Sequence, residues 1–175
     1  MSPELIFSLR DEDAADVEAI DALTRAAVAD HPFGQQTEHL IVRRRRAADA
    51  LSLSLVASQD GAPIIHAASP PVGFDGRIGG WLGLGPLSVA PRWQRRGVGS
   101  ALVRSGLRRL AERGAAGCVV LGDPAYFGRF GFAPQPGSLL PGVPAGHFMA
   151  LAMPGTADTL PAGTVAYRPA FKAAG

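Results

Sequence analysis

The stretch from Val89 to Leu102 reads V-A-P-R-W-Q-R-R-G-V-G-S-A-L, and it decides the fold. It has the pattern of a strand end, a basic loop with two glycines, and a helix that begins near residue 98. The first N–H groups of a helix lack intrahelical acceptors, and the helix dipole adds positive potential to them. Gly97 and Gly99 carry no side chains that would keep an anion away from the backbone. The stretch is therefore predicted to bind a phosphate or pyrophosphate group.

Three kinds of glycine-rich phosphate site compete for this stretch. A dinucleotide site has the pattern G-x-G-x-x-G, but its third glycine would fall at Leu102. A P-loop needs a lysine directly after its last glycine, and the only lysine of the chain is Lys172. The third kind is a turn that holds the pyrophosphate of coenzyme A.

Strand-like and helix-like segments alternate along the rest of the chain, which predicts an α/β fold with a mixed central sheet. Asp13 and Asp16 have the spacing of a capping pair for a helix that ends near His31 and Pro32. Glycines and a proline within residues 81–89 predict a bulge or a splayed edge in that strand. Further strands are predicted at residues 5–9, 51–57, 63–68, 118–121, 148–153 and 164–167, helices at 37–50, 98–113 and from 123, and loops at 70–71, 75–76 and 133–146.

Two motifs in this order resemble those of the GNAT N-acetyltransferases. Gln94 to Gly99 is similar to the motif Q/R-x-x-G-x-G/A of that family, and Tyr126 to Phe132 is similar to its Y-x-x-x-G-F element. The stretches T-E-H-L-I and L-G-D-P-A-Y-F-G-R-F-G-F resemble the bacterial YhbS-like branch. The pattern of elements extends from about residue 5 to about 170, and the specific motifs cover mainly Gly80 to Phe132.

The resemblance implies a single GNAT-like domain over residues 1–175. Its fold would be a mixed, mostly antiparallel central sheet with a splayed strand pair and helices on both faces. The acetyl-CoA pyrophosphate would sit on the turn, and the pantetheine arm would pair with the strand before it as an extra strand. The cofactor-binding residues implied in this way are Leu87, Ser88, Val89, Gln94, Arg95, Arg96, Gly97, Val98, Gly99, Ser100 and Phe127.

The family often places a proton-donating tyrosine four residues before the G-F pair, and this chain has Phe127 there with Tyr126 beside it. Either Tyr126 or water would then supply the proton to the departing thiolate. Adjacent residues of a helix point about 100° apart, so we expect Tyr126 to face away from the reacting atoms and to be mainly structural. Glu38 is the candidate general base, on a helix that borders the acceptor pocket in this family.

The four histidines are scattered, and with the single cysteine they show no metal-ligand spacing, so no metal is expected. His39 and His31 are further candidate bases near the expected pocket, and His147 resembles His31 in its loop setting. His66 lies in an apolar strand, where a histidine that is satisfied within the core is the more common case.

Charge is distributed unevenly along the chain. Residues 1–30 hold eight acids and two arginines, whereas residues 77–129 hold nine arginines and two acids. A local excess of positive charge favours an anionic ligand, which could be a phosphorylated cofactor or a nucleic acid. Arg43 to Arg46 would circle a helix, and no aromatic residues are interleaved with them, so we expect no nucleic-acid partner.

Cys118 is the only cysteine, no apolar run has the length of a membrane span, and the N-terminus lacks the features of a signal peptide. We therefore expect a cytoplasmic protein without a membrane partner, and a homodimer is left open. The predicted function is acetyl-CoA-dependent N-acetyl transfer to a primary amine of a small molecule or a protein. The alternatives are an acyl-CoA-binding regulatory module with little or no catalysis, and a nucleic-acid-binding protein.

Overall fold

The computed structural model of the chain describes residues 7–28, 53–85, 87–135, 137–144, 146–155 and 162–167. The helix expected at 37–50, with Glu38, His39 and Arg43 to Arg46, lies outside these ranges, as does His31.

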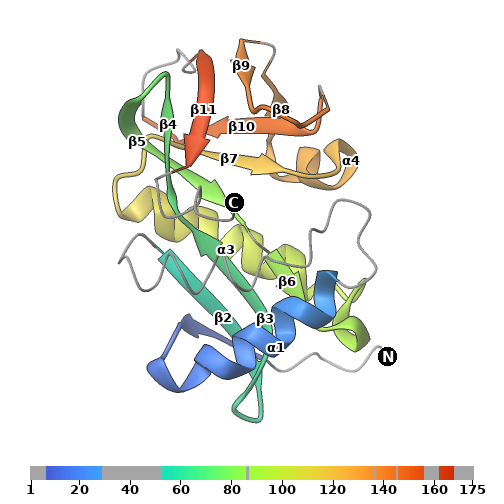
Figure 1. Ribbon diagram of the computed structural model, residues 1–175. Coiled ribbons are helices and arrows are strands. Elements are labelled where there is room, and N and C mark those ends of the chain that lie inside the picture. Colours follow the sequence, from blue (N-terminus) through green and yellow to red (C-terminus); the bar gives the residue numbers. More distant parts are fainter. Residues whose placement is uncertain are drawn as a thin grey trace.

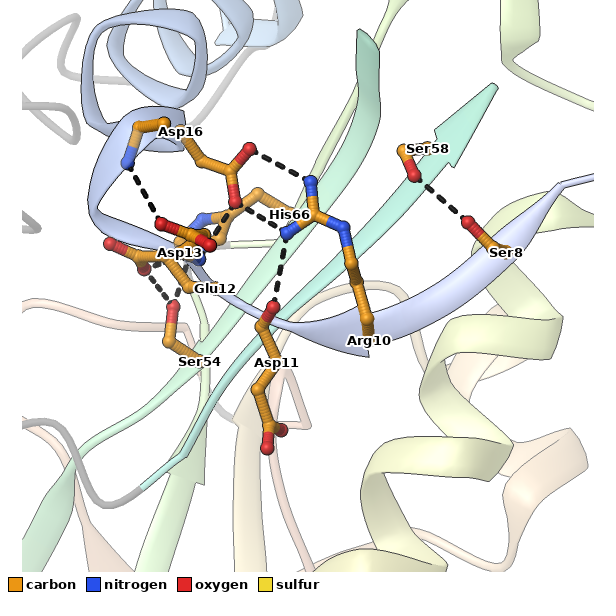
Figure 2. Close-up of polar contacts among 10 residues, drawn as sticks. Ser8, Arg10, Asp11, Glu12, Asp13, Asp16, Ser54, Ser58 and His66 are labelled. Carbon is orange, nitrogen blue, oxygen red and sulfur yellow. Dashed lines mark hydrogen bonds and ion pairs between the residues drawn. The ribbon is translucent and has the colours of Figure 1, made fainter. Parts of the chain in front are cut away.

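The first strand and the first helix meet at the predicted capping pair. β1 (Ser8–Asp11) leads into the 3-10 turn η1 (Ala14–Asp16) and then α1 (Val17–Val28). The Asp13 side chain accepts from Ala15 N–H at 3.2 Å, and the Asp16 carboxylate accepts from Asp13 N–H at 2.8 Å. The capping box is therefore confirmed. Arg10 adds two N–H bonds to the Asp16 carboxylate, at 2.6 and 2.8 Å (Figure 2).

This contact makes the stability of the fold dependent on pH. The Arg10 guanidinium and the Asp13 N–H hold the pKa of Asp16 below its usual range. A carboxylate with a lowered pKa stabilises the folded chain above its unfolded pKa of about 3.9, and this stabilisation is lost as the pH falls. Asp16→Ala should lower the free energy of unfolding at pH 7 by about 2 kcal/mol, through the lost cap and ion pair. Urea unfolding at pH 7 and pH 3 measures this, with a smaller difference expected at pH 3.

Asp16→Asn is the matched variant for this prediction, since it can still accept from Asp13 N–H but carries no charge. Its loss at pH 7 should be smaller than that of Asp16→Ala. Equal losses at pH 7 and pH 3 for both variants would show that the charge of Asp16 contributes nothing.

Four strands form the sheet that carries the turn. Their order is β1-β2-β3-β6, with β2 (Leu53–Gln59), β3 (Ala62–Ser69) and β6 (Leu87–Val89), and every pairing is antiparallel. In Figure 1, α1 crosses one face of this sheet, and α3 (Val98–Glu112) lies behind the other. Leu55 and Ile65 of the sheet and Leu102 and Leu110 of α3 are fully buried between the two layers.

A second sheet continues from the first. Its strand order is β8-β10-β7-β5-β4-β11-β9, in which the pairs β5–β7 and β9–β11 are parallel and the other pairs are antiparallel. The mixed, mostly antiparallel sheet is therefore confirmed. The bounds are β4 (Pro71–Phe74), β5 (Arg77–Leu84), β7 (Gly117–Leu121), β8 (Ala133–Pro134), β9 (Ser138–Leu139), β10 (Phe148–Ala152) and β11 (Gly163–Tyr167).

Two segments expected to be loops contain strands. β4 begins at Pro71, because Pro71 pairs with Leu82 and its missing N–H falls at the first position of the strand. β8 and β9 lie within the predicted loop at 133–146, where each pairs over two residues. The short helix predicted from residue 123 is confirmed as α4 (Pro124–Phe127), which continues into η3 (Gly128–Phe130).

The apolar run at 81–89 divides between the two sheets. β5 pairs in parallel with β7 as far as Leu84 and Val120, whereas β6 pairs with β3 of the first sheet. Gly85 N–H donates to Ala68 O at 2.8 Å, which keeps the chain beside β3 at the division. β6 is therefore an edge strand among the described strands, splayed away from β7 as predicted.

Candidate functional site

The turn between β6 and α3 is built from a short helical turn and two residues of left-handed backbone. η2 (Pro91–Trp93) leads out of β6, and Gly97 then forms the N-cap of α3. Arg95 has φ +61° and Gly97 has φ +79°. The left-handed region costs roughly 1–2 kcal/mol for a residue with a Cβ, so the conformation of Arg95 stores strain at this turn. Strained backbone of this kind is concentrated at ligand sites.

The first turn of α3 presents free hydrogen-bond donors. Ala101 N–H makes the first helical bond, to Gly97 O at 3.1 Å. The N–H groups of Val98, Gly99 and Ser100 have no acceptor among the described residues, and Gly97 has no side chain to cap them. Free amides and the positive end of the helix dipole together favour an anion at this position.

Gln94 and Arg96 are held in place by neighbours on the turn. Gln94 Nε2 donates to Val89 O at 3.1 Å, and the Arg96 guanidinium lies 5.5 Å from the centre of the Trp93 ring. Trp93 is buried, so its ring gives the Arg96 guanidinium a fixed surface to pack on. These contacts fix the shape of the turn independently of any ligand.

Positive charge surrounds the first turn of α3 without neutralising acids. Five arginines near it are exposed, and no carboxylate of the described chain forms an ion pair with them: Arg92, Arg95, Arg96, Arg104 and Arg129. Two ion pairs of arginine in the described part of the chain lie elsewhere, between Arg10 and Asp16 and between Arg109 and Asp11. The local field therefore attracts an anionic ligand to the turn.

The register of β6 shows which of its backbone groups face the open edge. Ala90 N–H donates to Ile64 O at 2.9 Å, and Ser88 is opposite His66. Hydrogen-bonded and non-hydrogen-bonded pairs alternate along an antiparallel ladder. The backbone of Ser88 therefore faces β3, and the backbones of Leu87 and Val89 face the edge. Leu87, Ser88 and Val89 were all expected to offer backbone groups to a ligand. Leu87 and Val89 are placed to do so, and Ser88 is not.

The structure brings Tyr126 to the turn, contrary to the expected orientation. The Tyr126 hydroxyl lies 3.3 Å from Ser100 Oγ, and a Cβ added to Gly99 would lie 3.2 Å from that hydroxyl. The Arg129 guanidinium lies 4.8 Å from the centre of the Tyr126 ring. Phe127 is buried instead, and its ring fills the space in which Gly122 would have a side chain. Tyr126 therefore lies at the helix N-terminus, and Phe127 packs in the core.

The remaining candidate residues lie away from this turn. His66 is fully buried in β3 and is described below, and His147 lies directly before β10. Cys118 is buried in β7, where burial raises the pKa of its thiol and leaves it unreactive. Among the described residues, no three histidine, cysteine or acidic side chains gather in a way that could hold a metal ion. Within the same ranges every helix is too short or too polar to span a bilayer.

Comparisons with known proteins agree with this geometry. The model of the acetyltransferase (GNAT) family matches residues 20–132. The uncharacterized N-acetyltransferase YhbS of Escherichia coli (strain K12) is 38% identical over 125 residues, which cover 71% of this chain and 72% of that protein. The structure is similar to that of a GNAT family acetyltransferase from Brucella melitensis in complex with acetyl-CoA, with a TM-score of 0.82 and 40% identity over 96% of this chain and 99% of that one. It is similar also to the structure of YhbS from Escherichia coli in complex with CoA, with a TM-score of 0.83 and 32% identity over 100% of this chain and 97% of that one.

Proposed function

Because this chain belongs to the acetyltransferase (GNAT) family, we propose that it transfers an acetyl group from acetyl-CoA to a primary amine of a small molecule or a protein. The observation that carries this proposal is the first turn of α3, where three backbone N–H groups without acceptors lie within a field of exposed arginines. The complexes of the two similar structures with acetyl-CoA and with CoA support it.

The turn and the edge of β6 suit two different parts of the coenzyme. The pyrophosphate would accept from the amides of Val98 to Ser100, with Gln94 to Gly97 enclosing it. The pantetheine arm would add to β6 as an extra strand, through the groups of Leu87 and Val89 that face the edge. Gly99 has no side chain between these two parts, so the coenzyme could pass close to the backbone.

The proposed reaction needs alignment and polarisation more than a covalent intermediate. Holding the amine against the thioester makes the attack effectively unimolecular, and a backbone N–H at the β6 edge would stabilise the charge on the carbonyl oxygen. The Tyr126 hydroxyl lies 3.3 Å from Ser100 Oγ, beside the proposed pyrophosphate site, and it would donate to the departing thiolate. We keep Tyr126 and Glu38 as the proposed catalytic residues, although Glu38 lies outside the described ranges.

Acetyl-CoA is expected to stabilise the fold. A ligand at about a hundredfold excess over its dissociation constant adds roughly 2.7 kcal/mol to the free energy of unfolding. The melting temperature measured with and without saturating acetyl-CoA checks this. S-acetylpantetheine, which has the thioester arm but no pyrophosphate, should produce a much smaller shift at the same concentration. Equal shifts from the two compounds would mean that the turn does not bind the pyrophosphate.

Release of free thiol from acetyl-CoA tests the transfer itself. The acceptors are a panel of polyamines, amino acids, aminoglycosides and peptide N-termini, with a mock reaction that lacks amine. The proposal expects release that depends on at least one amine. Binding of acetyl-CoA without such release would favour the regulatory module instead. A cytoplasmic location, a single domain over residues 1–175, no nucleic-acid or membrane partner, and a homodimer stay predictions.

A further inference from the structure

A row of buried and half-buried polar side chains crosses the first sheet on its α1 face. It starts at Glu12, directly after β1, and continues through Ser54 on β2 and His66 on β3 (Figure 2). Ser54 Oγ donates to Glu12 Oε2, His66 Nε2 lies 2.8 Å from Ser54 Oγ, and Glu12 Oε2 lies 3.5 Å from His66 Nε2. The His66 side chain is completely buried, and only a tenth of the Glu12 side chain is exposed.

With Glu12 ionised, these contacts favour one tautomer of His66. Ser54 has one hydroxyl hydrogen, and it is donated to the Glu12 carboxylate, which as an ionised group can only accept. Ser54 Oγ must therefore accept from His66, so that Nε2 carries the ring hydrogen of the neutral imidazole. The other nitrogen, Nδ1, is left as an unprotonated acceptor. It is buried and has no hydrogen-bond partner among the described residues.

Ser88 on β6 extends the row to the edge of the sheet. It is directly opposite His66 in the ladder, so the two side chains share one face with their Cβ atoms about 5 Å apart. Ser88 is also fully buried, and its Oγ has no partner among the described residues. His66 Nδ1 and Ser88 Oγ are therefore a free acceptor and a free hydroxyl on neighbouring strands, and they make no hydrogen bond to each other in this resting structure. Ser88 lies between the two residues of β6 whose backbones face the proposed coenzyme.

We propose that Glu12, Ser54, His66 and Ser88 form a proton relay for acyl transfer, in which His66 Nδ1, in place of Glu38, is the base. This inference rests on the proposed acetyl-CoA-dependent transfer. As the amine nitrogen bonds to the thioester carbon and the C–S bond breaks, the nitrogen loses a proton to Ser88 Oγ, directly or through one water. Rotation of the Ser88 side chain brings its hydroxyl to His66 Nδ1, with which it makes no hydrogen bond at rest. The hydroxyl proton then moves to Nδ1, and the Glu12 carboxylate stabilises the imidazolium. The proton then returns along the same path to the thiolate or to solvent, which restores the starting state without any further reactant.

Three carboxylates lie on the α1 side of the sheet with His66. Glu12 Oε2 lies 3.5 Å from His66 Nε2, η1 contributes the buried carboxylate of Asp16, and α1 contributes that of Asp21. Asp16 is already paired with Arg10, so Glu12 is the carboxylate that responds most directly to a charge on His66. The relay therefore predicts that the acid limb of the pH–kcat profile reports His66, and that removing the charge of Glu12 moves this limb to lower pH.

Ser88→Ala separates the relay from a purely structural role. The hydroxyl of Ser88 makes no hydrogen bond, so its removal should leave the melting temperature unchanged or raise it. The relay nevertheless expects kcat to fall by about a hundredfold or more, with the affinity for acetyl-CoA unchanged. Ser58→Ala is the matched control, because Ser58 is a buried serine of the same strand as Ser54 and bonds to Ser8 instead of the relay. Its kcat should match that of the wild type.

The experiment measures four proteins: wild type, Ser88→Ala, Glu12→Gln and Ser58→Ala. Calorimetry gives the affinity for acetyl-CoA, thiol release with the most active amine of the panel gives the pH–kcat profile, and NMR of the imidazole nitrogens gives the tautomer of His66. We expect the Nε2–H tautomer in the wild type, a loss of kcat in Ser88→Ala, and a shifted acid limb in Glu12→Gln.

Three outcomes would count against these inferences in different ways. An Nδ1–H tautomer, or normal kcat in Ser88→Ala, overturns the relay and leaves the proposed transferase function intact. If the wild-type protein binds acetyl-CoA but acetylates no amine of the panel, the proposed transferase function is wrong. The relay, which rests on that function, is then wrong as well. Equal losses in Ser58→Ala and Ser88→Ala would assign the effect to the packing of this face of the sheet.

Discussion

Gly97→Asp is expected to lower the affinity for acetyl-CoA at least about a hundredfold while the fold is retained. A Cβ at Gly97 would have no atom within 4 Å, so the aspartate has room. The backbone of Gly97 is left-handed, with φ +79°, and aspartate tolerates this region better than most residues. Its carboxylate would occupy the N-terminus of α3 and repel the pyrophosphate there. Calorimetric titration with acetyl-CoA measures the loss, and a melting curve without ligand checks the fold.

Gly97→Asn is the matched control, since it has the same shape without the charge. Its affinity should lie between those of the wild type and Gly97→Asp. The difference between the two variants should shrink as the salt concentration rises, because salt screens an exposed charge. If Gly97→Asp bound acetyl-CoA with wild-type affinity, the pyrophosphate would not bind at this turn.

Leu87→Pro and Val89→Pro are each expected to lower kcat while leaving the hydrogen bonds of the sheet intact. The N–H groups of Leu87 and Val89 face the edge of β6, so a proline there removes a donor from the ligand side and not from the ladder. Loss of one donor to the developing oxyanion costs about 10²–10³-fold in kcat. Turnover with the active amine and binding of acetyl-CoA measure whether the loss falls on kcat or on affinity.

Ser88→Pro is the contrasting variant, because the Ser88 backbone faces β3 and proline would break a ladder bond there. It should melt at a distinctly lower temperature than Leu87→Pro and Val89→Pro. If all three variants lost the same stability, the assignment of edge-facing groups in β6 would be wrong.

The turn and its helix could be predicted from the sequence because their signals are local. Gly97 and Gly99, the apolar spacing of α3 and the Asp13–Asp16 pair each lie within a few residues of the structure that they specify, and the structure confirms each of them. The splayed strand was predictable for the same reason, since glycines and a proline interrupt one apolar run.

Features that depend on pairing between distant segments could not be predicted in this way. The orientation of Tyr126 follows from Phe127 filling the space beside Gly122, which the sequence of α4 does not reveal. The proposed relay depends on a register shift between Ala57 and Ser58, which brings His66 opposite Val56 and close to Ser54. A regular hairpin over the Asp60–Gly61 turn would place His66 one residue further along β2.

The proposed relay and the proposed coenzyme site share a single strand. In β6 the backbones of Leu87 and Val89 face the edge, and the side chain of Ser88 between them faces His66. Alternation along one strand therefore places proposed carbonyl polarisation and proposed proton removal within three consecutive residues. This arrangement explains why a short edge strand would be the centre of the reaction.

Hydrogen–deuterium exchange with and without CoA tests the central claim most directly, because it locates the coenzyme without requiring an acceptor. The account predicts slower exchange in peptides covering Leu87 to Ala101, where the edge-facing amides of β6 and the free amides of α3 lie. The β2–β3 hairpin around Asp60 should be unaffected. Binding of CoA with protection confined to other segments, and none at Leu87 to Ala101, would contradict the account.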